Sequence, residues 1–431
     1  MRILAAGSPE AAAFLASLAE RAEWGAPDVE SVVRAILTDV RRRGDAAVFE
    51  HTARLDGVRL TAETVRVSEA EIQAAVGALP SGVREALTLA ASRIEAFHRQ
   101  QQRPSWFVPE AGTGLLGQMV RPLRRVGLYV PGGSAAYPSS VLMNAIPATV
   151  AGVAEIAMCT PVGPDRVLAP AVLAAAGIAG VREIYRVGGA QAVGALAFGT
   201  ATIPAVDKIV GPGNLYVATA KRLVFGVVGI DMVAGPSEVL VVADETAKAR
   251  WVAADLLAQA EHDPLASAVC VTPAPDLARA VADEADRQLS LLPRRDLVAR
   301  ALDRFGAVIV VADLAAAIAL ANRIAPEHLE LAVADPWALL PAVRNAGAVF
   351  LGAHTPAVAG DYLAGPNHVL PTAGTARFCS PLSVEDFQKR TSLLALTPEA
   401  LRAWREPIAL LARLEGLEAH ARSITMRTEA P

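Results

Sequence analysis

The sequence predicts an α/β protein with two Rossmann-like, doubly wound domains and helical extensions at its N-terminal and C-terminal ends. Two series of short β-rich segments alternate with helical patterns, which is typical of parallel βαβ units whose sheets are covered on both faces. The chain has 431 residues, more than one compact core usually holds, so two or three globular units are expected.

The strand predictions come from short apolar runs separated by helical segments. Ala-rich amphipathic stretches separate the first series, which is predicted at residues 127–130, 155–158, 183–187 and 208–210. Helices such as residues 246–261 interleave with the second series, which is predicted at residues 239–242, 268–271, 308–311, 328–333 and 348–351.

These patterns divide the chain into four parts. Residues 1–25 are expected to form an N-terminal helical segment. Residues 26–127 and 238–378 together form the first α/β domain, which carries most of the candidate site residues below. Residues 128–237 form the second α/β domain with its glycine-rich turns, and residues 379–431 form a C-terminal helical tail.

The composition argues against nucleic acid and membranes as partners. The formal net charge is −4 at pH 7, so the chain lacks the excess of Lys and Arg that neutralises phosphates or anionic lipid. The longest apolar stretch, residues 145–163, contains Pro147, Glu155 and Pro161, which indicates a buried helix and a strand instead of a membrane span. We therefore expect a small-molecule partner.

The cysteines and the first residues favour a cytoplasmic location. Three cysteines at wide spacing, each in or beside an apolar segment, predict neither a disulfide framework nor a thiolate zinc site: Cys159, Cys270 and Cys379. The apolar run at the start of the chain is too short for a secretory signal.

Four polar side chains are candidate metal ligands. Gln259 and His262 lie three residues apart in a predicted helix, so they would project from one face, and the Asp-Pro dipeptide that follows ends the helix there. Asp361 lies in a glycine-flanked turn, and His420 lies in a polar segment near the C-terminus. One amide oxygen, two imidazoles and a carboxylate suit zinc. The alternative is a surface Gln, ordinary His residues and a turn-forming Asp.

Glu327 and His328 form a candidate acid/base pair immediately before an alternating strand. Neighbours in an extended segment point to opposite faces, so the two serve one site only if the turn after Pro326 is irregular. A loop at the end of a strand allows this. The alternative is a solvated Glu327 and a His328 that caps the strand.

Three glycine-rich turns each follow a predicted strand and precede a helix, at residues 130–134, 187–191 and 210–214. Exposed backbone N–H groups and a helix N-terminus at such a turn can bind a phosphate or ribose. None of the three has the full G-x-G-x-x-G pattern, and glycine turns are common in α/β proteins. The turns therefore favour dinucleotide binding without specifying it.

Several longer motifs resemble those of the histidinol dehydrogenase family. Residues 230–239 read IDMVAGPSEV and residues 254–262 read ADLLAQAEH, and together they resemble the signature of that family. The resemblance covers nearly the whole chain and includes residues 127–133, 211–214, 327–328, 365–368 and 415–422. It implies a zinc-dependent, NAD-linked enzyme that oxidises L-histidinol to L-histidinal and then to L-histidine, the last steps of histidine biosynthesis.

The resemblance also implies a role for individual residues. One zinc ion per subunit would be held by Gln259, His262, Asp361 and His420, and NAD would be contacted by Tyr129, Gln191 and Asn214. The substrate pocket would be lined by the four zinc ligands together with Ser237, His328, His368 and Glu415. The family's homodimers have interlocked C-terminal segments, so the tail that carries Glu415 and His420 would reach the partner's site.

The chemistry agrees with these implied roles. Removing a hydride from an alcohol carbon also requires the hydroxyl proton to leave, and His328 can accept it as general base. The second oxidation needs a hydrated aldehyde, and Glu327 could deprotonate the attacking water. No cysteine lies in an electropositive setting that favours a thiolate, so hydrate chemistry is preferred.

Three other functions fit parts of the pattern. A zinc hydrolase could use Glu327 or His328 to activate water, but it leaves the glycine turns unexplained. An NAD-linked zinc alcohol dehydrogenase for another small polyol would use the same zinc site and turns, although Glu415 and the tail around His420 favour histidinol. A non-catalytic binding protein would have no use for an acid/base pair.

Overall fold

The computed structural model describes residues 1–21, 27–132, 136–163 and 167–428. The chain divides into two compact units. The first unit consists of Met1–Gln101 and Leu123–Phe387, and the second consists of Gln102–Pro122 and Gln388–Pro431.

A six-stranded parallel sheet forms one half of the first unit, with strand order β1-β11-β10-β9-β12-β13. Its strands are β1 (Arg2–Ala5), β9 (Glu238–Ala243), β10 (Ser267–Thr272), β11 (Gly306–Val310), β12 (His328–Ala332) and β13 (Ala348–Leu351). Strands β10 and β12 flank β9, so the order of connection reverses beside β9. Only this reversal brings residues about 90 positions apart in sequence into direct pairing, as between His328 and Val239.

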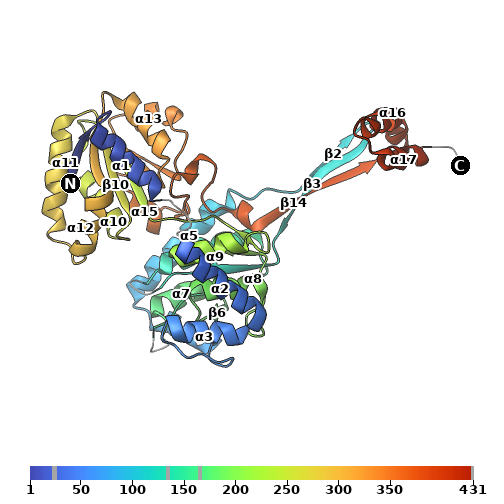
Figure 1. The fold of residues 1–431 in the computed structure, drawn as a ribbon, viewed down its shortest axis with the longest axis horizontal. Helices are drawn as coiled ribbons and strands as arrows, with labels where there is room; N and C mark the ends of the chain where they lie inside the picture. The colour runs from blue at the N-terminus through green and yellow to red at the C-terminus, as the bar shows by residue number, and fades with distance from the viewer. Residues whose placement is uncertain (22–26, 133–135, 164–166, 429–431) are drawn as a thin grey trace. The chain divides into compact units, whose positions relative to one another are not determined.

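Helices cover both faces of this sheet. On one face α1 (Pro9–Glu20) and α13 (Leu314–Ile324) pack against side chains such as Leu240 and Val242 (Figure 1). On the other face α10 (Ala249–Ala260), α11 (Pro275–Leu289) and α12 (Arg295–Phe305) pack against Val239 and Val241. Successive strand residues point to opposite faces, so a strand buried on both sides must be apolar throughout, as β9 is after its first residue. Shorter elements complete this half: α14 (Pro336–Leu339), η1 (Leu340–Ala342) and α15 (Ala357–Tyr362).

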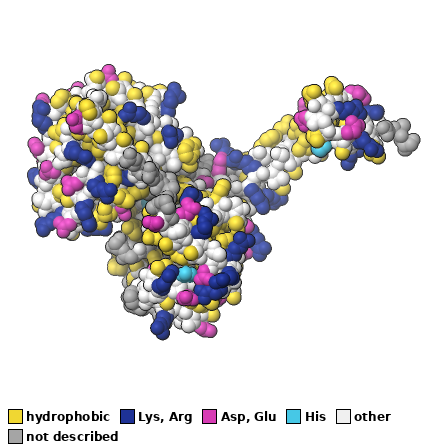
Figure 2. Space-filling view, viewed as in Figure 1, with side chains coloured by type: hydrophobic (Ala, Val, Ile, Leu, Met, Phe, Trp, Pro, Cys, Tyr) yellow, Lys and Arg dark blue, Asp and Glu magenta, His cyan; other side chains and the backbone are white. Residues whose placement is uncertain are grey.

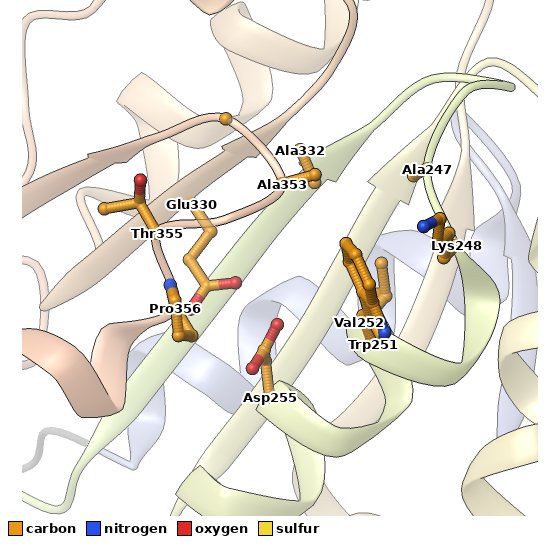
Figure 3. Close-up of a pocket in the computed structure, with 11 residues that line it drawn as sticks. Ala247, Lys248, Trp251, Val252, Asp255, Glu330, Ala332, Ala353, Thr355 and Pro356 are labelled. Carbon is orange, nitrogen blue, oxygen red and sulfur yellow. The ribbon is translucent and has the colours of Figure 1, made fainter.

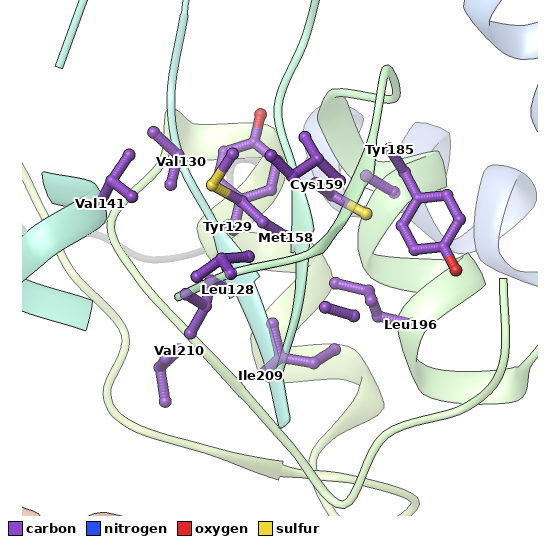
Figure 4. Close-up of a cluster of buried hydrophobic side chains, with 14 of the residues drawn as sticks. Leu128, Tyr129, Val130, Val141, Met158, Cys159, Tyr185, Leu196, Ile209 and Val210 are labelled. Carbon is purple, nitrogen blue, oxygen red and sulfur yellow. The ribbon is translucent and has the colours of Figure 1, made fainter. Parts of the chain in front are cut away.

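A five-stranded parallel sheet with the order β6-β5-β4-β7-β8 forms the other half. Its strands are β4 (Arg125–Tyr129), β5 (Glu155–Cys159), β6 (Glu183–Tyr185), β7 (Lys208–Val210) and β8 (Gly229–Ile230). The connecting helices are α6 (Pro138–Ala151), α7 (Pro170–Ile178), α8 (Gly189–Phe198) and α9 (Leu215–Val224). Figure 4 shows the core of this half, in which Leu128, Met158 and Leu196 are completely buried.

The N-terminal helices pack on this second sheet. They are α2 (Pro27–Arg43), α3 (Asp45–Leu55), α4 (Glu69–Ala78) and α5 (Ser81–Arg99). Helix α2 packs on α8 and α9, and α4 packs on α7, so Val33, Val48 and Ile72 share one core with β4–β7. From the sequence, residues 26–127 were instead expected to belong to the first domain. The position of these helices depends on which apolar helix faces pack against each other. The sequence pattern does not specify that pairing.

The second unit consists of a three-stranded antiparallel sheet and two helices. The strand order is β14-β3-β2, with β2 (Trp106–Glu110), β3 (Gly114–Pro122) and β14 (Gln388–Leu396). Helices α16 (Pro398–Leu414) and α17 (Glu418–Met426) pack together through four small or apolar side chains: Ala409, Ala412, Ala421 and Ile424. The tail is therefore not wholly helical, since β14 precedes its helices.

The predicted fold class is confirmed, with two parallel sheets wrapped by helices. The N-terminal segment differs from expectation because β1 pairs with β11 as an edge strand before α1 begins. Two 3₁₀ turns, η2 (Thr375–Arg377) and η3 (Val384–Phe387), lead toward the second unit. No helix in the described ranges combines the length and apolarity needed to cross a membrane. Lys and Arg are interspersed with Asp and Glu on the face shown in Figure 2.

Candidate active site

The acid/base candidates meet at the amino-terminal edge of the first sheet. Glu238 is the first residue of β9, His328 is the first residue of β12, and Glu327 directly precedes it. The two strands are parallel neighbours, so their first residues lie at the same edge. Ligands in open α/β sheets usually bind at the carboxyl ends of the strands, so this site lies at the opposite edge.

Glu238 and Glu327 hold each other in place. The Glu327 carboxylate accepts from the Glu238 backbone N–H at 2.8 Å, and the Glu327 N–H donates to the Glu238 carboxylate at 3.3 Å. The Glu238 carboxylate also accepts from the N–H of Ala373 at 3.1 Å and from the Arg21 guanidinium. Burial raises the pKa of Glu238 and raises that of Glu327 to about 7. Glu327 is therefore oriented and able to exchange a proton near neutral pH.

The hydrogen bonds of His328 determine which ring nitrogen can act as a base. Its Nδ1 lies 2.9 Å from the backbone carbonyl of Glu238, and because a carbonyl only accepts, Nδ1 carries the proton. In the neutral ring Nε2 is then the acceptor. Nε2 is buried without a hydrogen-bond partner among the described residues, although it lies 3.4 Å from an oxygen of Asp361. The His328 ring stacks on Phe350, with 5.8 Å between centroids.

His328 and Glu327 are adjacent in space as well as in sequence. The distance from His328 Nδ1 to the Glu327 carboxylate is 3.6 Å, because Glu327 lies in a bend before the strand instead of in the strand itself. Burial disfavours the charged imidazole, but the carboxylates of Glu327 and Asp361 outweigh it and raise the pKa of His328 to about 9. The irregular turn on which the sequence argument depended is present.

Asp361 and His368 lie on the other side of His328. Asp361 is on α15, and its backbone carbonyl accepts from Nδ1 of His368 at 2.9 Å. His368 Nε2 is buried without a hydrogen-bond partner in the described part of the chain. Burial opposes ionisation of Asp361, but interactions with His328 outweigh it, so the pKa of Asp361 is lowered. Burial lowers the pKa of His368. Near neutral pH this side of the site offers a carboxylate and a neutral imidazole.

Gln259 and His262 lie at the C-terminal end of α10 and just after it. Gln259 is buried in the last turn of the helix. The helix ends at Ala260, so His262 lies just beyond it instead of on its face. Residue 262 as a whole is exposed, yet its imidazole is desolvated by its neighbours, which lowers its pKa, and it feels the charges of Asp361 and His328. Ser237, half-buried, directly precedes β9.

A cavity of about 460 Å³ opens beside these residues. His328, Asp361 and His368 contribute its polar lining, whereas Phe350 and Leu382 belong to an apolar remainder. A mostly apolar pocket with a few converging polar groups is the usual form of a small-molecule site.

Glu415 and His420 belong to the second unit. Glu415 follows the last residue of α16 and His420 is on α17, and both are exposed. In the part of the chain that the structure describes, no three His, Cys, Asp or Glu side chains are grouped closely enough to hold a metal ion on their own.

The glycine turns lie at the carboxyl ends of the second sheet. Tyr129 ends β4, and its hydroxyl accepts from the N–H of Gly189, which begins α8. Gln191 is completely buried on α8, where its amide donates to Asp56 at 3.2 Å and its Oε1 is without a hydrogen-bond partner in the described chain. Burial raises the pKa of Tyr129 to about 12, so its hydroxyl stays protonated. In the turn predicted at residues 130–134, Gly133 and Ser134 lie outside the described residues.

The turn at residues 210–214 requires glycine at its first bend. Gly211 has φ +111°, and a Cβ there would lie 2.1 Å from the carbonyl oxygen of Tyr129. Buried Lys221 donates to the Gly211 carbonyl at 2.8 Å and pairs with Asp231, which accepts from the Gly211 N–H at 2.8 Å. Exposed Asn214 caps α9 by accepting from two backbone N–H groups at 3.1 Å. Buried Lys221 and Asp231 therefore fix the conformation of this turn, whereas the capping residue Asn214 faces solvent.

Sequence reasoning missed Glu238 as a support of the site. A charged residue that opens an otherwise apolar strand, EVLVVA, was the available signal. Phe350 and Arg21 had no such signal, because each acts through a contact with a residue far away in sequence.

Comparison with known proteins places the chain among the histidinol dehydrogenases. The family model described as histidinol dehydrogenase matches residues 19–428. The histidinol dehydrogenase of Syntrophotalea carbinolica is 54% identical over 99% of both chains, and that of Rhizobium meliloti is 57% identical over 96% of this chain and 95% of its own. The crystal structure of histidinol dehydrogenase from Elizabethkingia anophelis has a TM-score of 0.91 at 38% identity and covers 96% of this chain and 95% of its own. The chain belongs to the histidinol dehydrogenase family.

Proposed function

We propose that this protein is a zinc-dependent, NAD-linked dehydrogenase that oxidises L-histidinol through L-histidinal to L-histidine, the last steps of histidine biosynthesis. The observation that carries the proposal is the buried acceptor nitrogen of His328, held beside Glu327 and Asp361 at the edge of a cavity of about 460 Å³. A base, a second proton acceptor and room for a small substrate are what two successive oxidations at one carbon require.

His328 acts as the general base. Its Nε2 takes the hydroxyl proton of the substrate, while the hydrogen bond from Nδ1 to the Glu238 carbonyl keeps the ring in the required tautomer. The positive charge that develops on the ring is stabilised by the Glu327 and Asp361 carboxylates. A bound imidazole ring of the substrate would share the pocket with Phe350 and His368.

Glu327 serves the second oxidation, in which water adds to the aldehyde. Its pKa of about 7 allows it to accept a proton from water and release it again. A thiolate route is disfavoured because burial raises the pKa of Cys159 and Cys270 to about 12 and also raises that of Cys379.

The residues present fit a zinc site. Asp361 with its lowered pKa is a carboxylate, and His262 with its lowered pKa is neutral, and these are the forms that bind zinc. Gln259 adds an amide oxygen and His420 a second imidazole. When bound, zinc supplies a Lewis acid that docks the substrate, and NAD supplies the hydride acceptor.

The glycine turns fit NAD. Helix α8 begins at Gly189 and α9 at Leu215, so two helix N-termini meet the carboxyl ends of β6 and β7, where a pyrophosphate is favoured. Gln191, whose buried Oε1 has no hydrogen-bond partner among the described residues, and exposed Asn214 lie at these turns, where polar groups of the dinucleotide would contact them. The hydroxyl of Tyr129, at the end of β4, accepts from the Gly189 N–H in the turn before α8.

We propose that the active enzyme is a cytoplasmic homodimer in which residues 379–431 reach the partner's site. Helix α16 and the turn after it leave large apolar side chains exposed in the single chain, with Leu411 at 61% and Leu414 at 82%. Burying such a stripe against a second copy is favourable, at about 25 cal/mol for each Å² of apolar surface removed from water. In such a shared site, Glu415 would line the partner's substrate pocket and His420 would bind the partner's zinc ion. The three cysteines are free thiols, as is usual in a reducing compartment.

The decisive experiment counts NADH per L-histidinol consumed by the zinc-loaded protein, with a chelator-treated sample as control. Two NADH per substrate, lost on chelation, are expected. One NADH would indicate a simple alcohol dehydrogenase for which another polyol is the substrate. No NADH, together with zinc-dependent cleavage of an ester or amide, would favour the hydrolase.

The zinc ligands are tested by replacing His262 with Asn, which should lower zinc content and turnover together. Turnover that persists in a metal-free variant would contradict the zinc proposal. Size-exclusion chromatography with light scattering tests the dimer, and a monomer that keeps full activity would contradict shared sites.

A further inference from the structure

Two carboxyl groups that the proposed mechanism does not use lie next to each other in the first unit. Asp255 on α10 and Glu330 on β12 point toward one another (Figure 3), and the two carboxyl groups are close enough for each to affect the ionisation of the other. Glu330 is 4% exposed. Lys248, which lines the small cavity beside the pair, lies over the ring of Trp251 at 4.0 Å. The cavity beside the pair holds about 20 Å³, room for a single water and too little for a ligand.

A hydrogen bond between two carboxyl groups requires one proton between them. Burial raises the pKa of both carboxyl groups, and the negative charge of Asp255 raises that of Glu330 further. Near neutral pH the pair therefore holds one proton, with Glu330 as the favoured donor and Asp255 as the acceptor. Such a pair joins two elements directly, whereas two carboxylates would repel each other.

Glu330 makes a second connection. Its Oε1 accepts from the backbone N–H of Ala357 at 2.7 Å, and Ala357 is the first residue of α15. The first N–H groups of a helix have no partner within the helix, so this bond fixes where α15 begins. One buried side chain on β12 thus joins α10 on one side and α15 on the other.

The joined elements are those that carry the candidate site. Helix α10 holds Gln259 one turn after Asp255, on the same face, and leads to His262. Helix α15 holds Asp361 one turn after Ala357. The pair lies two residues along β12 from His328, so it fixes both helices to the strand that carries the base.

We infer that the Asp255–Glu330 pair is a positioning clamp for the zinc site, setting the distance between α10 and α15, the two helices that supply the ligands from this unit. Neither residue touches zinc or substrate. The inference rests on the proposed function, since it assigns the clamp to the proposed zinc site. Outer residues that orient metal ligands typically contribute about 10- to 100-fold to metal affinity.

Two variants of Glu330 separate the effect of its two hydrogen bonds from the effects of side-chain size and negative charge. In Glu330→Gln the amide oxygen still accepts from the Ala357 N–H and the amide nitrogen donates to Asp255, so wild-type zinc affinity is expected. In Glu330→Met, of similar length, both bonds are lost and zinc should bind about 10- to 100-fold more weakly. Exposed Glu69, on α4, provides the matched control, and Glu69→Met should bind zinc as the wild type does.

The primary readout is zinc retained by the full-length protein during titration with a competing chelator. The second is hydrogen exchange in zinc-free protein, where the α15 amides should exchange faster in Glu330→Met but not in Glu330→Gln. If Glu330→Met does not fold, Asp255→Leu replaces it, because that change keeps the bond to Ala357 and removes only the tie to α10, with the same loss of zinc affinity expected.

The outcomes distinguish the clamp from the proposed function. If the wild type binds zinc, unchanged zinc affinity and unchanged α15 exchange in Glu330→Met would overturn the clamp alone. Where Asp255→Leu replaces that variant, unchanged zinc affinity would do so. An equal loss of affinity in Glu330→Gln and Glu330→Met would also overturn it. A wild-type protein that binds no zinc would overturn the proposed cofactor and, with it, the clamp's role at a zinc site.

Discussion

Removing the Arg21 guanidinium should destabilise the first unit and loosen the support of the acid/base pair. The Arg21 side chain is 2% exposed and the Glu238 side chain with which it pairs is 6% exposed. Arg21 also donates to the carbonyl of Leu265 at 2.7 Å. Breaking a buried ion pair by removing one partner costs about 3–5 kcal/mol, because the other charge is left uncompensated. We expect Arg21→Met to lower the free energy of unfolding by that amount at about pH 8.

The loss of unfolding free energy in Arg21→Met should depend on pH. The pKa of Glu238 determines the direction of that dependence. Burial already raises the pKa of this carboxyl although Arg21 opposes the shift, so removing Arg21 should raise the folded-state pKa further. A group whose folded pKa lies above its unfolded value, about 4.3 for Glu, loses stability as the pH rises through the folded pKa. The deficit of Arg21→Met should therefore shrink when the pH is lowered from about 8 toward 5.

Urea denaturation of wild type and variant at both pH values measures this effect. Arg279→Met is the matched control, because Arg279 and its partner Asp276 are both exposed and their loss should change stability by less than about 0.5 kcal/mol. A deficit in Arg21→Met no larger than that of the control, or one that is the same at both pH values, would refute the reasoning.

Three further predictions concern turnover. Gly211→Ala should destabilise the protein by more than about 1 kcal/mol and raise the KM for NAD, because its Cβ would lie 2.1 Å from a carbonyl oxygen at φ +111°; unchanged melting and KM would contradict this. Glu327→Gln should slow the second oxidation by about 10²- to 10⁴-fold, so that one NADH forms per L-histidinol while L-histidinal accumulates, whereas a stoichiometry of two would remove Glu327 from that step. Because the base must be neutral and the pKa of His328 is raised to about 9, kcat/KM should increase with pH toward that value, and a maximum in acid would exclude His328 as the base.

Much of the fold was predictable because it depends on local periodicity. Apolar runs such as EVLVVA specify strands buried on both faces, and alternation with helices specifies parallel sheets. Antiparallel β2, β3 and β14 were not predicted, since β14 pairs with β3 across more than half of the chain. The start of α10 was misplaced by three residues because Asp244 accepts from the N–H of Thr246 and holds a turn there.

The sequence by itself determined the kinds of chemistry available: an adjacent carboxylate and imidazole, a Gln-x-x-His spacing, glycine turns after strands, and motifs that identify the family. It did not determine where these groups meet. Only the tertiary structure placed the acid/base pair at the amino-terminal edge of the sheet. By bonding Nδ1 of His328 to Glu238, it left Nε2 without a hydrogen-bond partner among the described residues. It also brought the carboxyl groups of Asp255 and Glu330 together. Side-chain periodicity is a property of neighbouring residues, whereas these contacts join residues 75 to 90 positions apart, and strand order, which no local pattern encodes, decides them.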